Sequence, residues 1–140
     1  METLLEPELK AVESDIRPRI LVIDDDQDQV KVLSYHLTGQ GFEVSSAFCA
    51  RDGLKLLQEK RPSLVLLDID LPDATGLEIC SKITDDPQTY QIPVIFVSGA
   101  ERPDILRQAR AVGCAYYMRK PYDPNALLVV IKQTLQENSF

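Results

Sequence analysis

Four short apolar runs, each followed at once by polar residues, constrain the fold of this chain more than any other feature. They are residues 20–23 before Asp24, Asp25 and Asp26, residues 64–67 before Asp68, residues 94–97 before Ser98, and residues 115–118 before Arg119 and Lys120. Continuous apolar runs of this length, separated by helix-like stretches, are typical of parallel strands that are buried on both faces. In an open parallel sheet the functional groups gather at the carboxyl ends of the strands. We therefore expect these polar side chains to meet at one edge of a sheet.

Strand and helix patterns alternate from residue 19 onward. The strand-like runs lie near residues 19–24, 42–47, 64–68, 93–97 and 115–118. The helix-like stretches lie near residues 27–38, 51–60, 75–84, 102–112 and 124–136. Gly39 and Gly113 stand where helices are expected to end, and Pro62 and Pro93 come just before strands. The pattern predicts an α/β fold of the (βα)5 type, which is a doubly wound, five-stranded parallel sheet with helices on both faces.

The chain has 140 residues, enough for one domain with a core and too few for a sizeable second one. We assign residues 18–140 to this domain and residues 1–17 to an acidic N-terminal extension. The extension is interpreted as a solvated tail, or as a short helix that docks on the domain or on a partner. The apolar residues on one helical face of the extension are Leu5, Leu9, Val12 and Ile16. The aromatic residues expected to serve in packing are Tyr35, Phe42, Phe48 and Phe96.

The charge and cysteine content narrow the classes of function. A net charge of −7 argues against direct binding to nucleic acid or to anionic membranes. No signal peptide is recognised at the acidic N-terminus, and no apolar stretch has the length needed to span a bilayer. The three cysteines share no metal-ligand spacing, which is typical of a reducing compartment. A cytoplasmic protein that does not insert into membranes is expected.

The polar residues at the expected strand ends suit phosphoryl transfer. An aspartate can attack a phosphoryl group to form an acyl phosphate, but two anions approach one another only if charge is neutralised. Asp24, Asp25 and Asp68 together would form a site of hard oxygen ligands that suits Mg²⁺. Lys120 adds a positive charge that can pair with a phosphoryl oxygen. Ser98 adds a hydroxyl that can donate to another oxygen.

The residues from about 19 to 136 resemble a receiver domain of two-component response regulators. The matching motifs are Leu-Val-Ile-Asp-Asp-Asp at residues 21–26, Leu-Asp-Ile-Asp-Leu-Pro at 67–72, Val-Ser-Gly at 97–99 and Lys-Pro-Tyr at 120–122, with Gly76 and Gly113 also in place. The resemblance implies a flavodoxin-like strand order of 2-1-3-4-5. It also implies a phosphorylation-activated signalling switch rather than an enzyme, with slow self-dephosphorylation as its only turnover.

The resemblance assigns roles to the acidic residues. Asp68 would accept the phosphoryl group from a histidine kinase or a histidine phosphotransfer protein. Asp25 and Asp68 would bind Mg²⁺, with Mn²⁺ as an alternative, and Asp24 would contact the metal through water. The backbone carbonyl of Asp70 would complete the protein ligands.

The resemblance also assigns the signalling roles. Lys120 would hold a phosphoryl oxygen, and its bond to Pro121 would be cis. Ser98 would move toward the phosphoryl group, and Tyr117 would then change between exposed and buried positions. The altered face would comprise the fourth helix, the fifth strand and the fifth helix of the domain, and it would bind an unknown downstream protein. Since little chain follows residue 136, a stand-alone receiver is expected.

Two departures from the family pattern and two competing functions remain open. Asp70 stands where a larger, uncharged residue is usual, so its carboxylate could repel the phosphoryl group or orient a hydrolytic water. Ala100 offers no polar group near the site. The first competing function is that of a phosphorylation-independent adaptor with the same fold. The second is that of a phosphatase like the haloacid dehalogenases, which the Asp68-Ile69-Asp70 motif resembles, although Pro72 replaces the threonine of that motif.

Overall fold

The computed structural model describes residues 17–138. Apart from Arg17, the acidic extension expected at the N-terminus lies outside the described residues, together with its proposed helical face. The described residues contain no helix that is long and apolar enough to cross a membrane.

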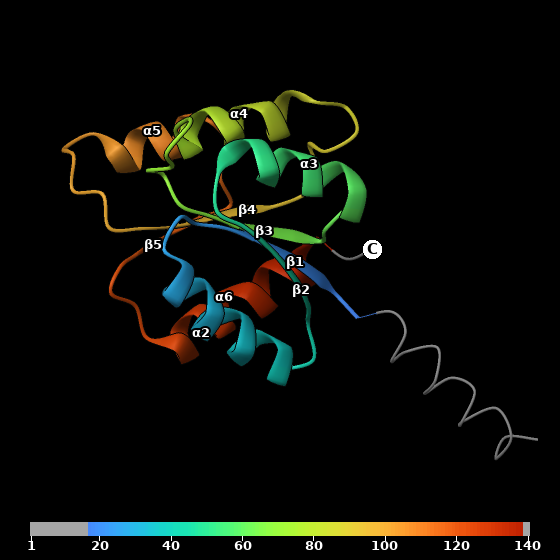
Figure 1. Cartoon of the computed structure of the whole chain (residues 1–140). Coiled ribbons are helices and arrows are strands. Elements are labelled where there is room, and N and C mark those ends of the chain that lie inside the picture. Colours follow the sequence, from blue (N-terminus) through green and yellow to red (C-terminus); the bar gives the residue numbers. More distant parts are fainter. Residues whose placement is uncertain (1–16, 139–140) are drawn as a thin grey trace, which may run out of the picture.

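Five parallel strands form one sheet in the order β2-β1-β3-β4-β5, which confirms the predicted fold class and strand order (Figure 1). The strands are β1 (Arg19–Ile23), β2 (Glu43–Ala47), β3 (Leu64–Leu67), β4 (Val94–Ser98) and β5 (Tyr116–Arg119). The helices between and after them are α2 (Gln27–Gly39), α3 (Ala50–Lys60), α4 (Gly76–Asp85), α5 (Ile105–Ala111) and α6 (Pro124–Glu137). The bounds agree with the sequence pattern to within one or two residues except at α5.

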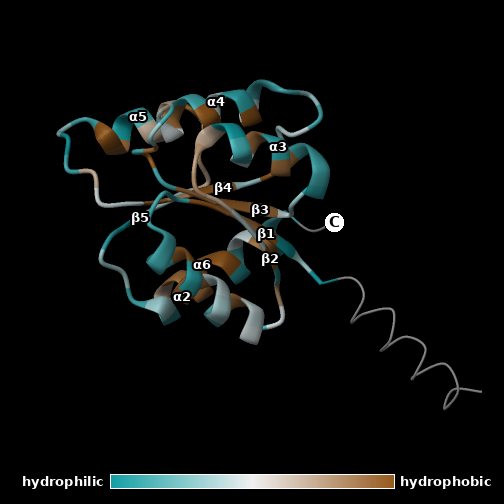
Figure 2. Cartoon of the chain, in the orientation of Figure 1, coloured by the Kyte–Doolittle hydropathy of each residue, from teal (hydrophilic) through white to brown (hydrophobic). Residues whose placement is uncertain are grey.

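The helices cover both faces of the sheet. Helices α3, α4 and α5 lie on one face and α2 and α6 on the other (Figure 1). Alternate residues of β1 therefore enter two cores: Leu21 and Ile23 pack in one, and Ile20 and Val22 in the other. Figure 2 shows the central strands β1, β3 and β4 as mainly hydrophobic and the helices as hydrophobic on the sides that face the sheet. This double burial explains why the strands read as continuous apolar runs.

Helix starts follow local capping chemistry. The Asp26 side chain accepts a hydrogen bond from the backbone N of Gln29 at the start of α2, and Thr75 does the same for Glu78 in α4. Helix α5 begins at Ile105 rather than near residue 102. The proline at position 103 explains the difference, because the residue before a proline is disfavoured from helical backbone angles.

The aromatic predictions were only partly right. Phe42 and Phe96 are buried, but the exposed fraction is 85% for Tyr35 and 39% for Phe48. The prediction that Tyr35 and Phe48 serve in packing was therefore wrong. Helix α2 buries Val30, Leu33 and Leu37, and Tyr35 lies outside that stripe.

Candidate phosphoacceptor site

The register of the strands gathers the polar residues at one edge of the sheet. Ile23 pairs with Leu67, and Leu67 pairs with Phe96. Parallel pairing continues one residue beyond the strands, since the backbone N of Asp68 donates to the carbonyl of Ile23 at 2.9 Å. In the same way the N of Lys120 donates to the carbonyl of Ser98 at 2.9 Å. Residues far apart in the sequence are thus held side by side by main-chain hydrogen bonds.

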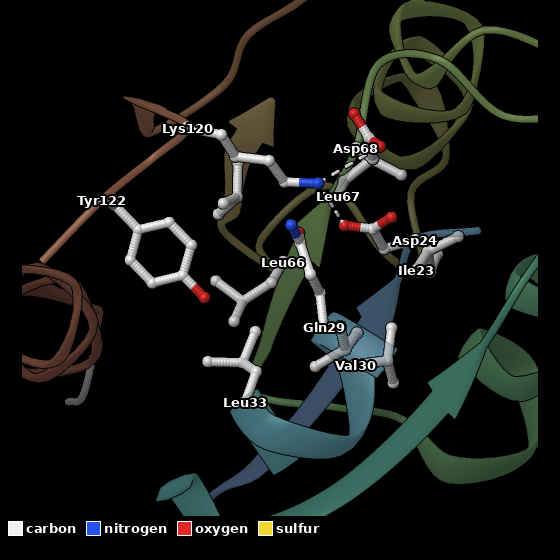
Figure 3. Close-up of a pocket in the computed structure, with 12 residues that line it drawn as sticks. Ile23, Asp24, Gln29, Val30, Leu33, Leu66, Leu67, Asp68, Lys120 and Tyr122 are labelled. Carbon is white, nitrogen blue, oxygen red and sulfur yellow. Dashed lines mark hydrogen bonds and ion pairs between the residues drawn. The ribbon is translucent and has the colours of Figure 1, made fainter. Parts of the chain in front are cut away.

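The amine of Lys120 lies between two carboxylates. Its Nζ is 2.6 Å from Oδ2 of Asp24 and 3.6 Å from Oδ2 of Asp68 (Figure 3). The side chains of Lys120 and Asp24 are only 17% and 10% exposed. At this depth an ion pair is weakly screened by solvent, so Lys120 is the main positive charge that offsets the two aspartates.

Three carboxylates form an acidic cluster that could hold a metal ion. One carboxylate oxygen from each of Asp24, Asp25 and Asp68 lies within 4.8 Å of the others. Asp24 and Asp68 are buried, whereas Asp25 is exposed. Clustered carboxylate oxygens are the donors that Mg²⁺ takes in proteins, and an exposed side leaves room for water and phosphate ligands. The donor set therefore fits a hard divalent cation.

The ionisable side chains of the site shift one another's pKa. Burial, followed by the negative charge of Asp24, raises the pKa of Asp68, while Lys120 and the hydroxyl of Ser98 oppose this rise. Burial alone would lower the pKa of Lys120, but its hydrogen bond to Asp24 and the charges of Asp68 and Asp24 raise that pKa overall. Lys120 therefore stays protonated, and Asp68 carries its charge at a free-energy cost.

Ser98 and Tyr117 lie behind the pocket. Ser98 is fully buried at the end of β4, and its Oγ accepts a hydrogen bond from the backbone N of Ala100 at 3.2 Å. Tyr117 is half-buried on β5, with its ring centroid 6.2 Å from that of Phe96. The Tyr117 hydroxyl is buried and has no hydrogen-bond partner among the residues that the structure describes.

The loop after the candidate phosphoacceptor is tightly built. The backbone N of Asp70 donates to Oδ1 of Asp68 at 3.4 Å, and Asp70 forms an isolated antiparallel bridge with Thr75. Gly76 packs directly against this loop, because a Cβ there would overlap the carbonyl oxygen of Asp68 and lie 2.9 Å from Cα of Ile69. Only glycine fits at this position.

Some residues near the site were not predicted from the sequence. The amide of Gln29 points toward the Lys120 amine, and the hydroxyl of Tyr122, a residue of the Lys-Pro-Tyr motif to which no role was assigned, points toward Leu33 and Leu66 (Figure 3). The enclosed space that they help to line has a volume of about 10 Å³, which suits about one water molecule. Burial also raises the pKa of Tyr122.

Asp73, to which no role was assigned from the sequence, caps a helix from another part of the chain. Its two carboxylate oxygens accept hydrogen bonds from the backbone N of Ala50 at 2.8 Å and of Arg51 at 3.0 Å. These bonds lower the pKa of Asp73. The sequence held one signal for this contact: Cys49, which precedes α3, is a poor N-cap, so the first N–H groups of that helix need another acceptor.

Two ion pairs connect the loops around the pocket. Nη1 of Arg102 lies 3.1 Å from Oδ1 of Asp70, and Nη2 of Arg119 lies 3.3 Å from Oε1 of Glu101. The peptide bond from Lys120 to Pro121 is cis, as the resemblance implied.

Comparison with known proteins supports the same interpretation. A family model of the response regulator receiver domain matches residues 20–132. The response regulator PleD of Caulobacter vibrioides is 32% identical over 114 residues, which make up 81% of this chain and 25% of PleD. The phosphate regulon transcriptional regulatory protein PhoB of Rhizobium meliloti is 29% identical over 119 residues, or 85% of this chain and 52% of PhoB. The chain thus spans between a quarter and about half of the length of these relatives.

Solved structures agree in fold. A CheY-like response regulator receiver domain protein from Methanospirillum hungatei JF-1 superposes with a TM-score of 0.83 and 31% identity, covering 87% of this chain and 96% of that one. A putative response regulator from Chloroflexus aurantiacus J-10-fl gives a TM-score of 0.81 at 24% identity, covering 86% of this chain and 98% of that one, which shows the shared fold.

Proposed function

This chain belongs to the response regulator receiver domain family, and on that premise we propose that Asp68 accepts a phosphoryl group from a histidine kinase or a histidine phosphotransfer protein. The modified domain then regulates a partner protein. The strongest support for this proposal is that Nζ of Lys120 lies between the buried carboxylates of Asp24 and Asp68. Because Cys49, Cys80 and Cys114 are free thiols, which suits a reducing compartment, we propose that the reaction takes place in the cytoplasm.

The proposed transfer is a substitution at phosphorus. A carboxylate oxygen of Asp68 forms a bond to phosphorus while the P–N bond to the imidazole of the donor breaks, and the imidazole leaves with the electron pair and takes up a proton. Lys120 pairs with a phosphoryl oxygen and offsets the added negative charge. Slow hydrolysis of the acyl phosphate by water would return the domain to its starting state.

Asp25, Asp68 and the backbone carbonyl of Asp70 would bind the proposed metal directly, and Asp24 would contact it through water. The close approach of three carboxylate oxygens supports this assignment. When bound there, Mg²⁺ or Mn²⁺ would neutralise the negative charge of the phosphoryl oxygens.

The proposed output runs through Ser98 and Tyr117. A phosphoryl group adds close to two negative charges and strong acceptors, so the Ser98 hydroxyl, which already interacts with the Asp68 carboxylate, gains stronger acceptors if it moves toward the modified side chain. The buried Tyr117 hydroxyl has no partner among the described residues, so no polar contact opposes movement of this ring. The change would alter the face made by α5, β5 and α6, which we propose binds the downstream protein.

Intact-mass measurement tests the central step. The protein is incubated with acetyl phosphate, with and without Mg²⁺, beside an Asp68→Asn variant. We expect a single phosphoryl adduct that needs Mg²⁺, is absent from the variant and is removed by hydroxylamine. If no adduct forms, binding of beryllofluoride in the presence of Mg²⁺ is measured instead. Failure of both would contradict the proposal and favour the phosphorylation-independent adaptor.

Turnover of a phosphate ester distinguishes the proposed switch from a phosphatase. We expect no release of phosphate from p-nitrophenyl phosphate beyond the rate of the Asp68→Asn variant. Release over many turnovers would favour the phosphatase instead.

A further inference from the structure

The carboxylate of Asp70 adds a negative charge two residues after Asp68, which must receive an anionic donor. The sequence left two roles open for it, repulsion of the phosphoryl group or orientation of a hydrolytic water. In the structure its Oδ1 instead accepts a hydrogen bond from Nη1 of Arg102 at 3.1 Å. The two side chains are 59% and 53% exposed. An ion pair this exposed contributes little to folding stability. We therefore expect it to affect the negative charge of Asp70 that an incoming phosphoryl donor meets.

The pair joins the two loops that carry the proposed reacting groups. Asp70 is tied to the phosphoacceptor, since its backbone N donates to Oδ1 of Asp68. Arg102 belongs to the loop that leaves β4 after Ser98, and its carbonyl accepts a hydrogen bond from the N of Ile105 at 3.1 Å where α5 begins. Both loops lie at the carboxyl end of the sheet (Figure 1). The Arg102 side chain thus joins the loop after β4 to the loop after β3.

Glu101, the neighbour of Arg102, pairs with Arg119, which directly precedes Lys120. The guanidinium of Arg119 thus has a carboxylate partner of its own, whereas that of Arg102 pairs with Asp70.

We propose that Arg102 is a positioning residue for phosphoryl transfer, which holds and neutralises the carboxylate of Asp70 so that it neither repels the phosphoryl donor nor turns toward Asp68. This inference rests on the proposed function of Asp68. A carboxylate released from Arg102 would lower the local concentration of anionic donors, an effect that salt screens.

A double-mutant cycle tests the inference. The initial rate of phosphorylation by acetyl phosphate is measured by intact mass at saturating Mg²⁺ and low ionic strength. We expect Arg102→Ala to slow it about three- to ten-fold, as one uncompensated charge near the site would. In an Asp70→Asn background, which keeps the backbone carbonyl of Asp70 but removes its charge, adding Arg102→Ala should cause no further loss of rate. Arg102→Lys, which keeps the charge, should retain most of the rate.

Two further measurements separate this role from a structural one. The loss of phosphorylation rate in Arg102→Ala should disappear near 1 M NaCl, where charges more than a few ångströms apart are screened. Arg107→Ala is the matched control, because Arg107 also pairs with a carboxylate, that of Asp104 at 3.0 Å within the first turn of α5. This variant removes the same charge elsewhere and should keep the wild-type rate.

The inference is overturned if Arg102→Ala matches the wild type, if the Arg107 control loses as much rate, or if the Arg102 deficit persists in the Asp70→Asn background. An unmodified wild-type protein would be a different result, because it would remove the proposed function itself.

Discussion

Removal of the Lys120 amine should affect both stability and phosphorylation, because this amine compensates two buried carboxylates. We expect Lys120→Ala to lower the free energy of unfolding by about 1–3 kcal/mol, less than for a fully buried pair since the site is partly open. Phosphorylation by acetyl phosphate should fall at least ten-fold. Urea unfolding in EDTA and intact mass measure the two effects. Lys132→Ala, at an exposed position on α6, is the control, and equal behaviour of the two variants would contradict the prediction.

The ionisation of Asp68 should make stability depend on pH. Because burial and Asp24 raise the pKa of Asp68 above 3.8 in the folded protein, the folded state binds this proton more tightly than the unfolded state does. Without metal, stability is therefore lost as the pH rises from 3.8 through the folded pKa, and the loss persists above it. Asp68→Asn cannot ionise.

Melting temperatures in EDTA test this pH dependence. The variant should melt a few degrees above the wild type near pH 7 and approach it at low pH. Added Mg²⁺ should reduce the difference, because the cation stabilises only the ionised site. A constant difference at all pH values would show that the effect does not come from ionisation.

At the scale of residues, the sequence was informative where a side chain follows a strand and uninformative where it lies in an exposed loop. Asp24, Asp68 and Lys120 were expected together because parallel strands align their ends, and the structure places them within one ion-pair cluster. The contact of Arg102 with Asp70 and the capping of α3 by Asp73 depend on loop paths. No periodicity encodes those paths.

Two glycines provide a matched test of how α4 is joined to β3. Gly76→Ala should destabilise the protein by about 2–4 kcal/mol, because the new Cβ would overlap main-chain atoms of Asp68 that cannot move aside. It should also slow phosphorylation, since the Asp68 peptide must shift. Gly39→Ala has no atom within 4 Å of its Cβ and lies at the end of α2. It should be neutral or slightly stabilising. Chemical denaturation compares them, and similar losses in both would be evidence against this packing argument.

At the scale of elements, the sequence predicted strands and helices well because each core-facing stripe repeats with the period of its element. Tyr35 was misassigned because α2 carries apolar and aromatic side chains on more than one face. Val32 and Tyr35 are 72% and 85% exposed, while Val30 and Leu33 are buried. Composition alone does not say which face meets the sheet.

Metal binding should stabilise the whole domain, because the three carboxylates come together only when β1 and β3 are paired. At Mg²⁺ ten times above its Kd, the free energy of unfolding should rise by about 1.4 kcal/mol. EDTA should reverse the rise, and NaCl at matched ionic strength should not reproduce it. Asp25→Asn should abolish it with little change in the metal-free melting temperature, since Asp25 is exposed. A full Mg²⁺ response in this variant would exclude Asp25 as a ligand.

At the scale of the molecule, the strand order could be expected once the resemblance was recognised, and the structure confirms it. Apolar runs alone predict a parallel sheet but not the full order of its strands, because the three strands buried along their length, β1, β3 and β4, have similar apolar patterns and could pair in any order. The motifs at the strand ends supplied the missing information.

The contact between Asp24 and Lys120 also has a consequence for synthesis of the chain on the ribosome, because 96 residues separate the two. At about 5–20 residues per second, roughly 5–20 s pass between translation of the first residue and the second. A nascent chain that holds Asp24 and Asp68 but still lacks Lys120 has two converging carboxylates and no ammonium between them. Nascent or prematurely terminated chains would thus be poor phosphoacceptors, so the ability to receive a signal would arise only after the last strand has been made.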